Sequence, residues 1–342
     1  MDYKPLFEIT PHLLQRIATA TERKTWIAHA IIQVPWLNRL QRESAARLAH
    51  ASTAIEGNPL SLSDVQTLAS GERTADRAGK EEKEALNYLS ALRWIRNQPA
   101  MGKIRESDIL ELHRRLTAET LSPEAVGVYK VKANRIVDAK GRTVYTPPPP
   151  SRAGPQTRAL IDWIHSPEAY ALHPVITSAI AHHRLVSIHP FADGNGRIAR
   201  ALATWLLYSR GFDTEHIFAL DDFFEADRQR YYDTLQQARD LDDVLTYWIE
   251  YVAEGICATL TATQGRIETL QREYRGITLT LTKRQEEVLR LLRDYPRLKS
   301  PDFEKAFAIT RARVAQIIGP LVDAGLVVRE GQTRATYYRL AR

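Results

Sequence analysis

The chain has 342 residues, of which 44% are hydrophobic and 26% are charged. These proportions exclude disorder throughout and predict a globular protein with two or more domains. The single cysteine, Cys257, excludes an internal disulfide framework and a Cys-rich metal site. No signal-peptide pattern follows Met1, and no apolar stretch is long enough to predict a membrane span. We therefore expect a cytoplasmic protein without a membrane partner.

The net charge of +6 is concentrated at one end of the chain. Residues 277–342 hold 13 Lys and Arg against 7 Asp and Glu, which leaves 34 of each sign in residues 1–276. Such segregation indicates a separate module with an anionic partner, and nucleic acid is the first candidate.

Most of the chain is predicted to be helical, because apolar residues recur at three- and four-residue spacing. The expected helices before residue 277 are 40–55, 81–95, 106–116, 158–164, 175–186, 198–208 and 243–274. A β-hairpin is expected at Val128–Tyr145, with strands at 129–131 and 143–145 around a turn at 138–141. Pro147 to Pro150 are expected to stop any strand or helix and to hold the chain extended.

The basic end of the chain follows a predicted linker at Arg275 and Gly276. Its expected helices are 283–294, 300–307 and 310–324, and its expected strands are 326–329 and 336–340. Three helices followed by a hairpin resemble a winged helix-turn-helix, in which Arg311, Arg313 and Gln316 could reach bases or phosphates and Arg334 a phosphate. Dimerisation or docking of a protein is the alternative use of this module.

The predicted domains are thus an N-terminal helical region (1–100), a core (101–250), a helical linker (251–276) and the basic module (277–342). The core contains a loop between two helices that reads HPFADGNGRIAR, from His189 to Arg200. Gly194 and Gly196 allow backbone N–H groups to converge on an anion at the N-terminus of the second helix. Arg197 and Arg200 share a face of its first turn, where arginine is unfavourable unless an anion binds.

The same loop carries a carboxylate and an imidazole. Asp193 suits Mg²⁺, which usually takes one or two carboxylates together with phosphate oxygens. His189 supplies a titratable nitrogen that could remove a proton from an attacking hydroxyl. Zinc bound by His182, His183 and His189 is the weaker alternative, because no Cys or Glu completes a tetrahedral set.

The string from His189 to Arg200 resembles the signature of the Fic family, His-Pro-Phe-x-Asp/Glu-Gly-Asn-Gly-Arg-x-x-Arg. The resemblance implies a Fic helical core that transfers AMP from ATP to a Tyr, Thr or Ser hydroxyl of a target protein, with release of pyrophosphate. It implies that His189 is the general base and that Asp193 holds Mg²⁺. The implied ATP site comprises Phe191 as an apolar anchor of the loop, Gly194, Asn195, Gly196, Arg197, Arg200, and Tyr231 and Tyr232 near the adenine. Packing at the edge of the core is the alternative role for the two tyrosines.

Two further features gain meaning from this resemblance. The hairpin 128–145 would be the flap that pairs with the target protein. Ser52 and Glu56 lie in a Ser-x-x-x-Glu-Gly sequence that resembles the inhibitory motif of class II Fic proteins, which precedes the core. Glu56 would pair with Arg200 in place of the γ-phosphate and keep basal activity low. Some relatives use this glutamate to remove AMP from the target, and the sequence leaves both roles open.

The alternative hypothesis is that the protein is a DNA-binding transcriptional regulator whose Fic core senses a nucleotide. The intact signature favours the enzyme, because a sensor has no need of a general base such as His189. The resemblance also suggests a homodimer.

Overall fold

The computed structural model describes residues 3–30, 34–71, 78–99, 102–137, 140–212, 215–273, 281–331 and 336–341. Within these ranges the protein is mainly helical with two small antiparallel sheets, as the sequence predicts. The elements of the first 273 residues are α1 (Pro11–His29), α2 (Val34–Ile55), α3 (Leu62–Ala69), α4 (Lys80–Arg96), α5 (Glu106–Thr117), β1 (Ile136–Val137), β2 (Thr143–Tyr145), α6 (Pro150–Ile164), α7 (Pro167–Ala171), α8 (Pro174–Ile188), α9 (Asn195–Ser209), α10 (Asp221–Ala226), α11 (Arg228–Asp240) and α12 (Thr246–Glu273).

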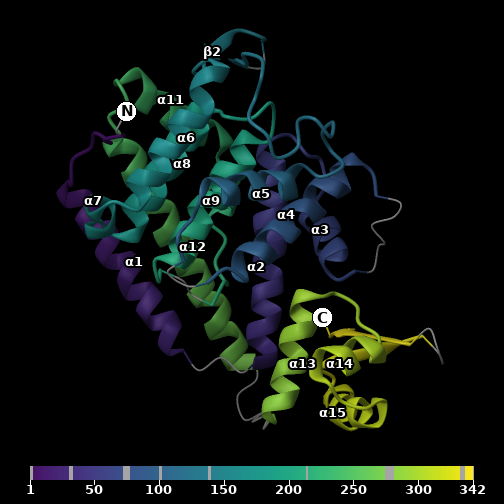
Figure 1. Ribbon diagram of the computed structural model, residues 1–342. Helices are drawn as coiled ribbons and strands as arrows, with labels where there is room; N and C mark the ends of the chain where they lie inside the picture. The colour runs from purple at the N-terminus through teal and green to yellow at the C-terminus, as the bar shows by residue number, and fades with distance from the viewer. Residues whose placement is uncertain are drawn as a thin grey trace.

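Helix α8 forms the centre of the large domain. Almost all of its residues are buried, because α6, α9 and α12 pack around it. Helix α1 lies along α12 at one side of the domain (Figure 1). The loop 189–194 joins α8 to α9, so two mutually packed helices fix both of its ends.

Helices α2 and α4 cover the N-terminal end of α9. Both contact α9, and they also pack on each other. Helix α2 ends at Ile55, and the chain reverses at Gly57, whose φ of +92° suits glycine at a helix end. The residues just before and after this reversal, Glu56 and Asn58, are therefore carried toward α9 and α4.

The C-terminal module has its own hydrophobic core, which includes Leu289, Phe303, Val314, Leu321 and Tyr338. Its elements match the three helices and two strands expected from the sequence. They are α13 (Lys283–Asp294), α14 (Ser300–Phe307), α15 (Arg311–Asp323), β3 (Val327–Glu330) and β4 (Tyr337–Leu340). The predicted linker Arg275–Gly276 and the wing residue Arg334 lie outside the described residues.

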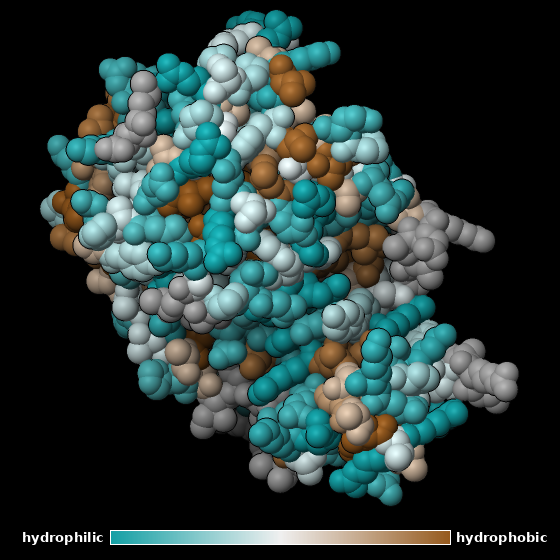
Figure 2. Space-filling model, in the orientation of Figure 1, coloured by the Kyte–Doolittle hydropathy of each residue, from teal (hydrophilic) through white to brown (hydrophobic). Residues whose placement is uncertain are grey.

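The module is attached to the large domain mainly through α13. Arg293 Nη1 donates to Gln41 Oε1 on α2 at 2.8 Å, and Arg96 Nη1 on α4 donates to Asp294 Oδ1 at 3.0 Å. In Figure 1 the module forms a separate lobe beside the end of α2. Figure 2 shows a largely hydrophilic face on which hydrophobic residues form small separate patches. Among the described residues, none of the helices combines the length and the apolar content needed to cross a bilayer.

The first strand of the hairpin is wrongly placed by the sequence prediction. The observed strand is β1, and Tyr129 and Lys130 instead contact the loop after α8. Lys130 N donates to Pro190 O at 2.9 Å, and the Tyr129 ring stacks on Phe191. Tyr129 and Lys130 therefore pack on this loop, whereas Val131 is 87% exposed. Residues 138 and 139 of the expected turn lie outside the described residues.

The proline run is the second correction. Pro150 begins α6, eight residues before the predicted start at residue 158. Proline is tolerated in the first turn because the first N–H groups of a helix have no intrahelical partner. Helices α1, α3, α7, α10 and α11 are absent from the predicted set.

Candidate nucleotide-binding site

The loop after α8 begins and ends at residues with left-handed backbone conformation. His189 ends α8 with φ 49°, and its N–H donates to Leu185 O at 3.0 Å. Gly194 has φ 76° and precedes the first turn of α9. A Cβ added at Gly194 would lie 3.0 Å from Thr117 Cγ2. Glycine therefore allows the sharp entry into α9 that leaves the N–H groups of its first turn without intrahelical partners.

Side chains inside the loop hold its shape. The Asn195 amide accepts from Phe191 N and donates to Phe191 O, both at 2.9 Å. The Phe191 ring is fully buried and stacks on His113, with 3.8 Å between ring centroids. His113 Nε2 also lies 3.0 Å from Asp193 O. The Asn195 side chain, expected among the phosphates, is thus used as a brace, and the supporting role of His113 in α5 was missed by the sequence prediction.

The His189 imidazole is poised as a proton acceptor. Its Nδ1 lies 3.2 Å from Val186 O, so Nδ1 carries the hydrogen and Nε2 has the free lone pair. Burial, with a smaller contribution from the charges of Lys130 and Arg239, lowers the His189 pKa to about 4 against the opposing effect of the Val186 hydrogen bond. The ring is therefore neutral at pH 7, as a general base must be before it accepts a proton.

Every guanidinium nitrogen of Arg200 has a partner. This side chain is buried, and its Nε donates to Ser52 Oγ at 2.8 Å. Its Nη2 donates to Ser52 O at 2.8 Å and to Glu56 Oε1 at 2.7 Å, and its Nη1 donates to Tyr231 OH at 3.3 Å. Burial disfavours the charge, but Tyr231, Glu56 and Asp221 outweigh it and raise the Arg200 pKa.

The Glu56 carboxylate occupies the N-terminal turn of α9. A Cβ built on Gly196 would collide with Glu56 Oε1, so the absence of a side chain at this position admits the carboxylate. Backbone N–H groups at a helix N-terminus favour an anion. Glu56 therefore fills, with a protein carboxylate, the position where the sequence predicts an anionic ligand.

Arg197 has a different environment. It is 3% exposed, and its Nη1 lies 3.5 Å from Glu84 Oε1 on α4. Its Nη2 lies 3.7 Å from Asp193 Oδ2. Among the described residues, neither Nε nor Nη1 of Arg197 has a hydrogen-bond partner. Asp193 itself is 59% exposed, and its Oδ1 accepts from Gly194 N at 2.6 Å, so Oδ2 faces solvent and Arg197.

The two tyrosines of α11 differ in placement. Tyr231 is buried, and its hydroxyl contacts Arg200 and lies 3.0 Å from His182 Nε2. Tyr232 is 44% exposed, and its hydroxyl donates to Ile55 O at 3.1 Å. Tyr231 therefore packs in the core behind Arg200, whereas the exposed ring of Tyr232 remains a candidate contact for a base.

The structure does not gather the histidines into a metal site. Burial holds the pKa of His182 well below its usual range and lowers that of His183 to about 3. No group of three or more His, Cys, Asp or Glu side chains among the described residues could hold a metal ion. The zinc alternative for His182, His183 and His189 is therefore unsupported.

A buried acid behind Arg200 was also missed by the sequence prediction. Asp221 Oδ2 at the start of α10 lies 3.9 Å from Arg200 Nε and accepts from Tyr88 OH at 2.9 Å. Burial raises the Asp221 pKa to about 6, against the opposing effects of Arg200 and the Tyr88 hydrogen bond. A lone Asp and a lone Tyr in amphipathic helices carry no sequence signal for this contact.

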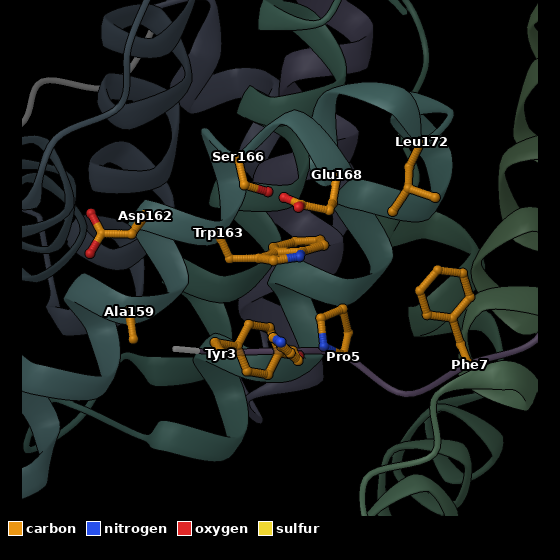
Figure 3. Close-up of a pocket in the computed structure, with 10 residues that line it drawn as sticks. Tyr3, Pro5, Phe7, Ala159, Asp162, Trp163, Ser166, Glu168 and Leu172 are labelled. Carbon is orange, nitrogen blue, oxygen red and sulfur yellow. The ribbon is translucent and has the colours of Figure 1, made fainter. Parts of the chain in front are cut away.

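A separate hollow of about 600 Å³ lies away from this loop. It is formed by the N-terminal segment, including Tyr3 and Phe7, facing Trp163 on α6 and Leu172 beyond α7 (Figure 3). Tyr3 and Trp163 meet edge to face with ring centroids 5.7 Å apart. None of the residues from His189 to Arg200 lines this hollow, so it is distinct from the candidate nucleotide site.

The chain is similar to curated proteins named protein adenylyltransferases. The chain is 31% identical over 238 residues to the protein adenylyltransferase fic-1 of Caenorhabditis briggsae, covering 68% of this chain and 44% of that relative. It is 34% identical over 232 residues to the protein adenylyltransferase Fic of Nematostella vectensis, covering 66% of this chain and 50% of that relative. The chain thus spans about half the length of these curated relatives.

Solved structures share the fold. A Fic family protein from Desulfovibrio desulfuricans G20 has a TM-score of 0.66 and 23% identity, covering 99% of this chain and 98% of the other, a likeness of fold. Fic-1 (aa134–508) from C. elegans has a TM-score of 0.62 and 27% identity, covering 75% of this chain and 73% of the other. Residues 103–207 match the Fic/DOC family. The segment that carries α5, α6, α8, the loop from His189 and most of α9 is therefore a Fic domain.

Proposed function

We propose that the protein is an autoinhibited protein adenylyltransferase, which transfers AMP from ATP to a Tyr, Thr or Ser hydroxyl of a target protein. One observation carries the proposal: the Glu56 carboxylate lies on Arg200 at the N-terminus of α9, directly after a loop that presents a neutral His189. A site that binds a carboxylate this way suits a phosphate group. The curated relatives with adenylyltransferase names support the same reaction.

The proposed reaction needs one base and several fixed positive charges. His189 Nε2 takes the proton of the target hydroxyl, whose oxygen attacks the α-phosphorus of ATP. The bond from that phosphorus to the β-phosphate oxygen breaks, and pyrophosphate leaves with the electron pair. Arg197, Arg200 and the amides at the start of α9 hold the distal phosphates. Such a transfer depends mainly on positioning and charge neutralisation.

Mg²⁺ fits at Asp193. Its side chain is 59% exposed, and only one of its oxygens accepts a backbone hydrogen bond. One carboxylate with remaining positions open to water and phosphate is the arrangement Mg²⁺ prefers in proteins. The ion would supply neutralisation of the phosphate charge.

Autoinhibition follows from competition for Arg200. While Glu56 and Ser52 occupy the guanidinium, the γ-phosphate of ATP lacks this partner, and the α-phosphate is misaligned for in-line attack. A use of Glu56 in removing AMP from a target stays a prediction from the sequence.

The target would dock on the flap 128–145. Strands β1 and β2 form a short antiparallel pair, and Val137 and Val144 on them are 46% and 43% exposed. An exposed two-stranded edge can pair with an extended segment of another chain. The flap also leads into α6, which packs on α8 beside the loop.

A second proposed activity is DNA binding by residues 277–342. Arg311, Arg313 and Gln316 are exposed at the N-terminal end of α15, which is where a recognition helix contacts bases. If this module binds DNA phosphates, the logarithm of its association constant should fall linearly with the logarithm of the salt concentration. The alternative is a transcriptional regulator in which the Fic domain senses a nucleotide. The homodimer and the cytoplasmic location stay predictions from the sequence.

Incubation with Mg²⁺ and ATP labelled at the α-phosphate tests the enzyme against the sensor. Wild type, Glu56→Gly and Glu56→Gly/His189→Ala are compared for label on the protein itself or on a lysate. We expect little label with wild type, at least tenfold more with Glu56→Gly because a charge-assisted pair contributes about 1.5–3 kcal/mol, and none with the double variant. Binding of ATP without label in any variant would favour the nucleotide-sensing regulator.

A further inference from the structure

Helix α4 lies beside both signature arginines. Glu84 and Tyr88 are four residues apart and therefore share a face of this helix. Glu84 Oε1 is 3.5 Å from Arg197 Nη1, and Tyr88 donates to Asp221, which lies behind Arg200. Helix α4 thus meets the site beside α2, against which it packs.

The Arg197–Glu84 contact is an ion pair without a hydrogen bond. Both side chains are largely buried, with Arg197 at 4% and Glu84 at 15% exposure. Two nitrogens of Arg197, Nε and Nη1, have no hydrogen-bond partner among the described residues. A buried guanidinium with unpaired N–H groups favours an anionic ligand that supplies acceptors. Arg197 is thus neutralised by Glu84 but retains free donors.

Asn58 joins Glu84 to the segment that carries Glu56. Its Nδ2 donates to Glu84 Oε2 at 3.0 Å and to the backbone carbonyl of Glu81 at 3.0 Å. Its Oδ1 accepts from Leu60 N at 3.1 Å, and the side chain is buried. Asn58 lies two residues after Glu56, so the end of α2 and the α4 carboxylate are held by one short connection.

We propose that Glu84 is a second acidic restraint on the nucleotide site, which acts on Arg197 as Glu56 acts on Arg200 and is coupled to Glu56 through Asn58. The inference rests on the proposed nucleotide site at residues 189–200, but it does not require that AMP be transferred. Glu56, just after α2, thus faces Arg200, and Glu84 on α4 faces Arg197.

The restraint has an electrostatic basis. In the absence of nucleotide, Glu84 compensates the buried charge of Arg197. A triphosphate bound at the start of α9 competes for Arg197 and is repelled by the nearby carboxylate, because like charges in a partly buried site are poorly screened. Neutralising Glu84 removes this repulsion and leaves Arg197 uncompensated until an anion binds. Both effects strengthen nucleotide binding.

The test measures binding of Mg²⁺-ATP to the full chain by isothermal titration calorimetry. Glu84→Gln keeps the volume and an amide oxygen for Asn58 but removes the charge. We expect its dissociation constant to fall about threefold to tenfold relative to wild type. Glu81→Gln, which removes an exposed carboxylate from the same helix, is the matched control and is expected to stay within about twofold of wild type.

The thermal unfolding of the same proteins gives a second readout. The Glu84→Gln protein should unfold at a lower temperature than wild type without ligand and show a larger upward shift on adding Mg²⁺-ATP. A purely structural role of Glu84 would lower both temperatures equally and leave the shift unchanged, which would overturn the proposal. An unchanged or higher dissociation constant in Glu84→Gln would overturn it as well.

The coupling through Asn58 is tested with Glu56→Gln and Glu56→Gln/Glu84→Gln. Because neutralising one carboxylate weakens the contact of the other with its arginine, we expect the double variant to gain less affinity than the product of the two single effects. Multiplicative effects would contradict the link through Asn58. Loss of the proposed function has a different signature: ATP binds with these affinities, but no variant transfers label from its α-phosphate.

Discussion

The two signature arginines of α9 are three residues apart, yet their surroundings differ. Each guanidinium nitrogen of Arg200 donates a hydrogen bond, and the acceptors are on Ser52, Glu56 and Tyr231. Arg197 is also buried, but its only partners among the described residues are the ion pairs of 3.5 Å with Glu84 and 3.7 Å with Asp193. The same site therefore contains one arginine whose nitrogens are all hydrogen-bonded and one arginine with N–H groups that are unpaired in the described part of the chain.

This difference indicates that one buried arginine mainly stabilises the fold and the other mainly binds the ligand. Arg200 connects α9 to α2, α10 and α11 through Ser52, Asp221 and Tyr231, so its replacement should affect folding as well as binding. Arg197 contributes less to the packing of the free protein, so its replacement should chiefly affect the ligand.

The largest expected effect is on the stability of Arg200 variants. Arg200→Met leaves Asp221, which is 1% exposed, without its buried counter-ion. Breaking a buried pair in this way costs about 3–5 kcal/mol of unfolding free energy. Arg197→Met should cost less, because Glu84 keeps its hydrogen bond from Asn58 and Asp193 is exposed to solvent. Urea denaturation of both proteins measures the difference, and equal losses would contradict the division of tasks.

A smaller effect on stability is expected at Tyr88, which contacts Asp221 behind Arg200. Tyr88→Phe removes the hydroxyl that donates to Asp221 and should lower the unfolding free energy by about 1–2 kcal/mol. Tyr251→Phe is the matched control, because the buried Tyr251 hydroxyl has no hydrogen-bond partner among the described residues. The control should be neutral or slightly stabilising. Equal losses in the two variants would show that the Tyr88 hydrogen bond does not support the Arg200 side of the site.

The smallest effect is expected from pH on AMP transfer. Burial lowers the His189 pKa to about 4, so the base is already neutral throughout the range from pH 6.5 to 8. The rate with Glu56→Gly should therefore vary by less than about twofold in this range. A fall in rate centred near pH 6.5, the ordinary histidine value, would show that His189 is not held neutral by its surroundings.

The fold could be predicted where local patterns were strong. The helices around the loop and the three helices and hairpin of the C-terminal module follow from apolar periodicity and turn residues. Helix α1 was missed because its buried residues, Leu13, Ala20 and Ile27, are seven apart and leave only a narrow apolar stripe for α12. Strand β1 was missed because it has only two residues, Ile136 and Val137, whereas 129–131 has the alternation typical of a strand without forming one.

The site could be predicted where its residues are adjacent in sequence. The spacing within residues 189–200 indicates an anion site, and the resemblance of the Ser52–Glu56 segment anticipates the contact with Arg200 that the structure contains. Glu84, Tyr88 and Asp221 could not be found in this way. They reach the arginines through the packing of α4 and α10, which depends on the whole domain. Their residue types occur on the exposed faces of most helices.

The central claim is that the α-phosphorus of ATP is the atom attacked, and one paired labelling experiment tests it most directly. Glu56→Gly is incubated with Mg²⁺ and ATP labelled either at the α-phosphate or at the γ-phosphate, with Glu56→Gly/His189→Ala as the blank. The account predicts covalent label on protein from the α-phosphate and none from the γ-phosphate. Label from the γ-phosphate, or label that persists without His189, would contradict it.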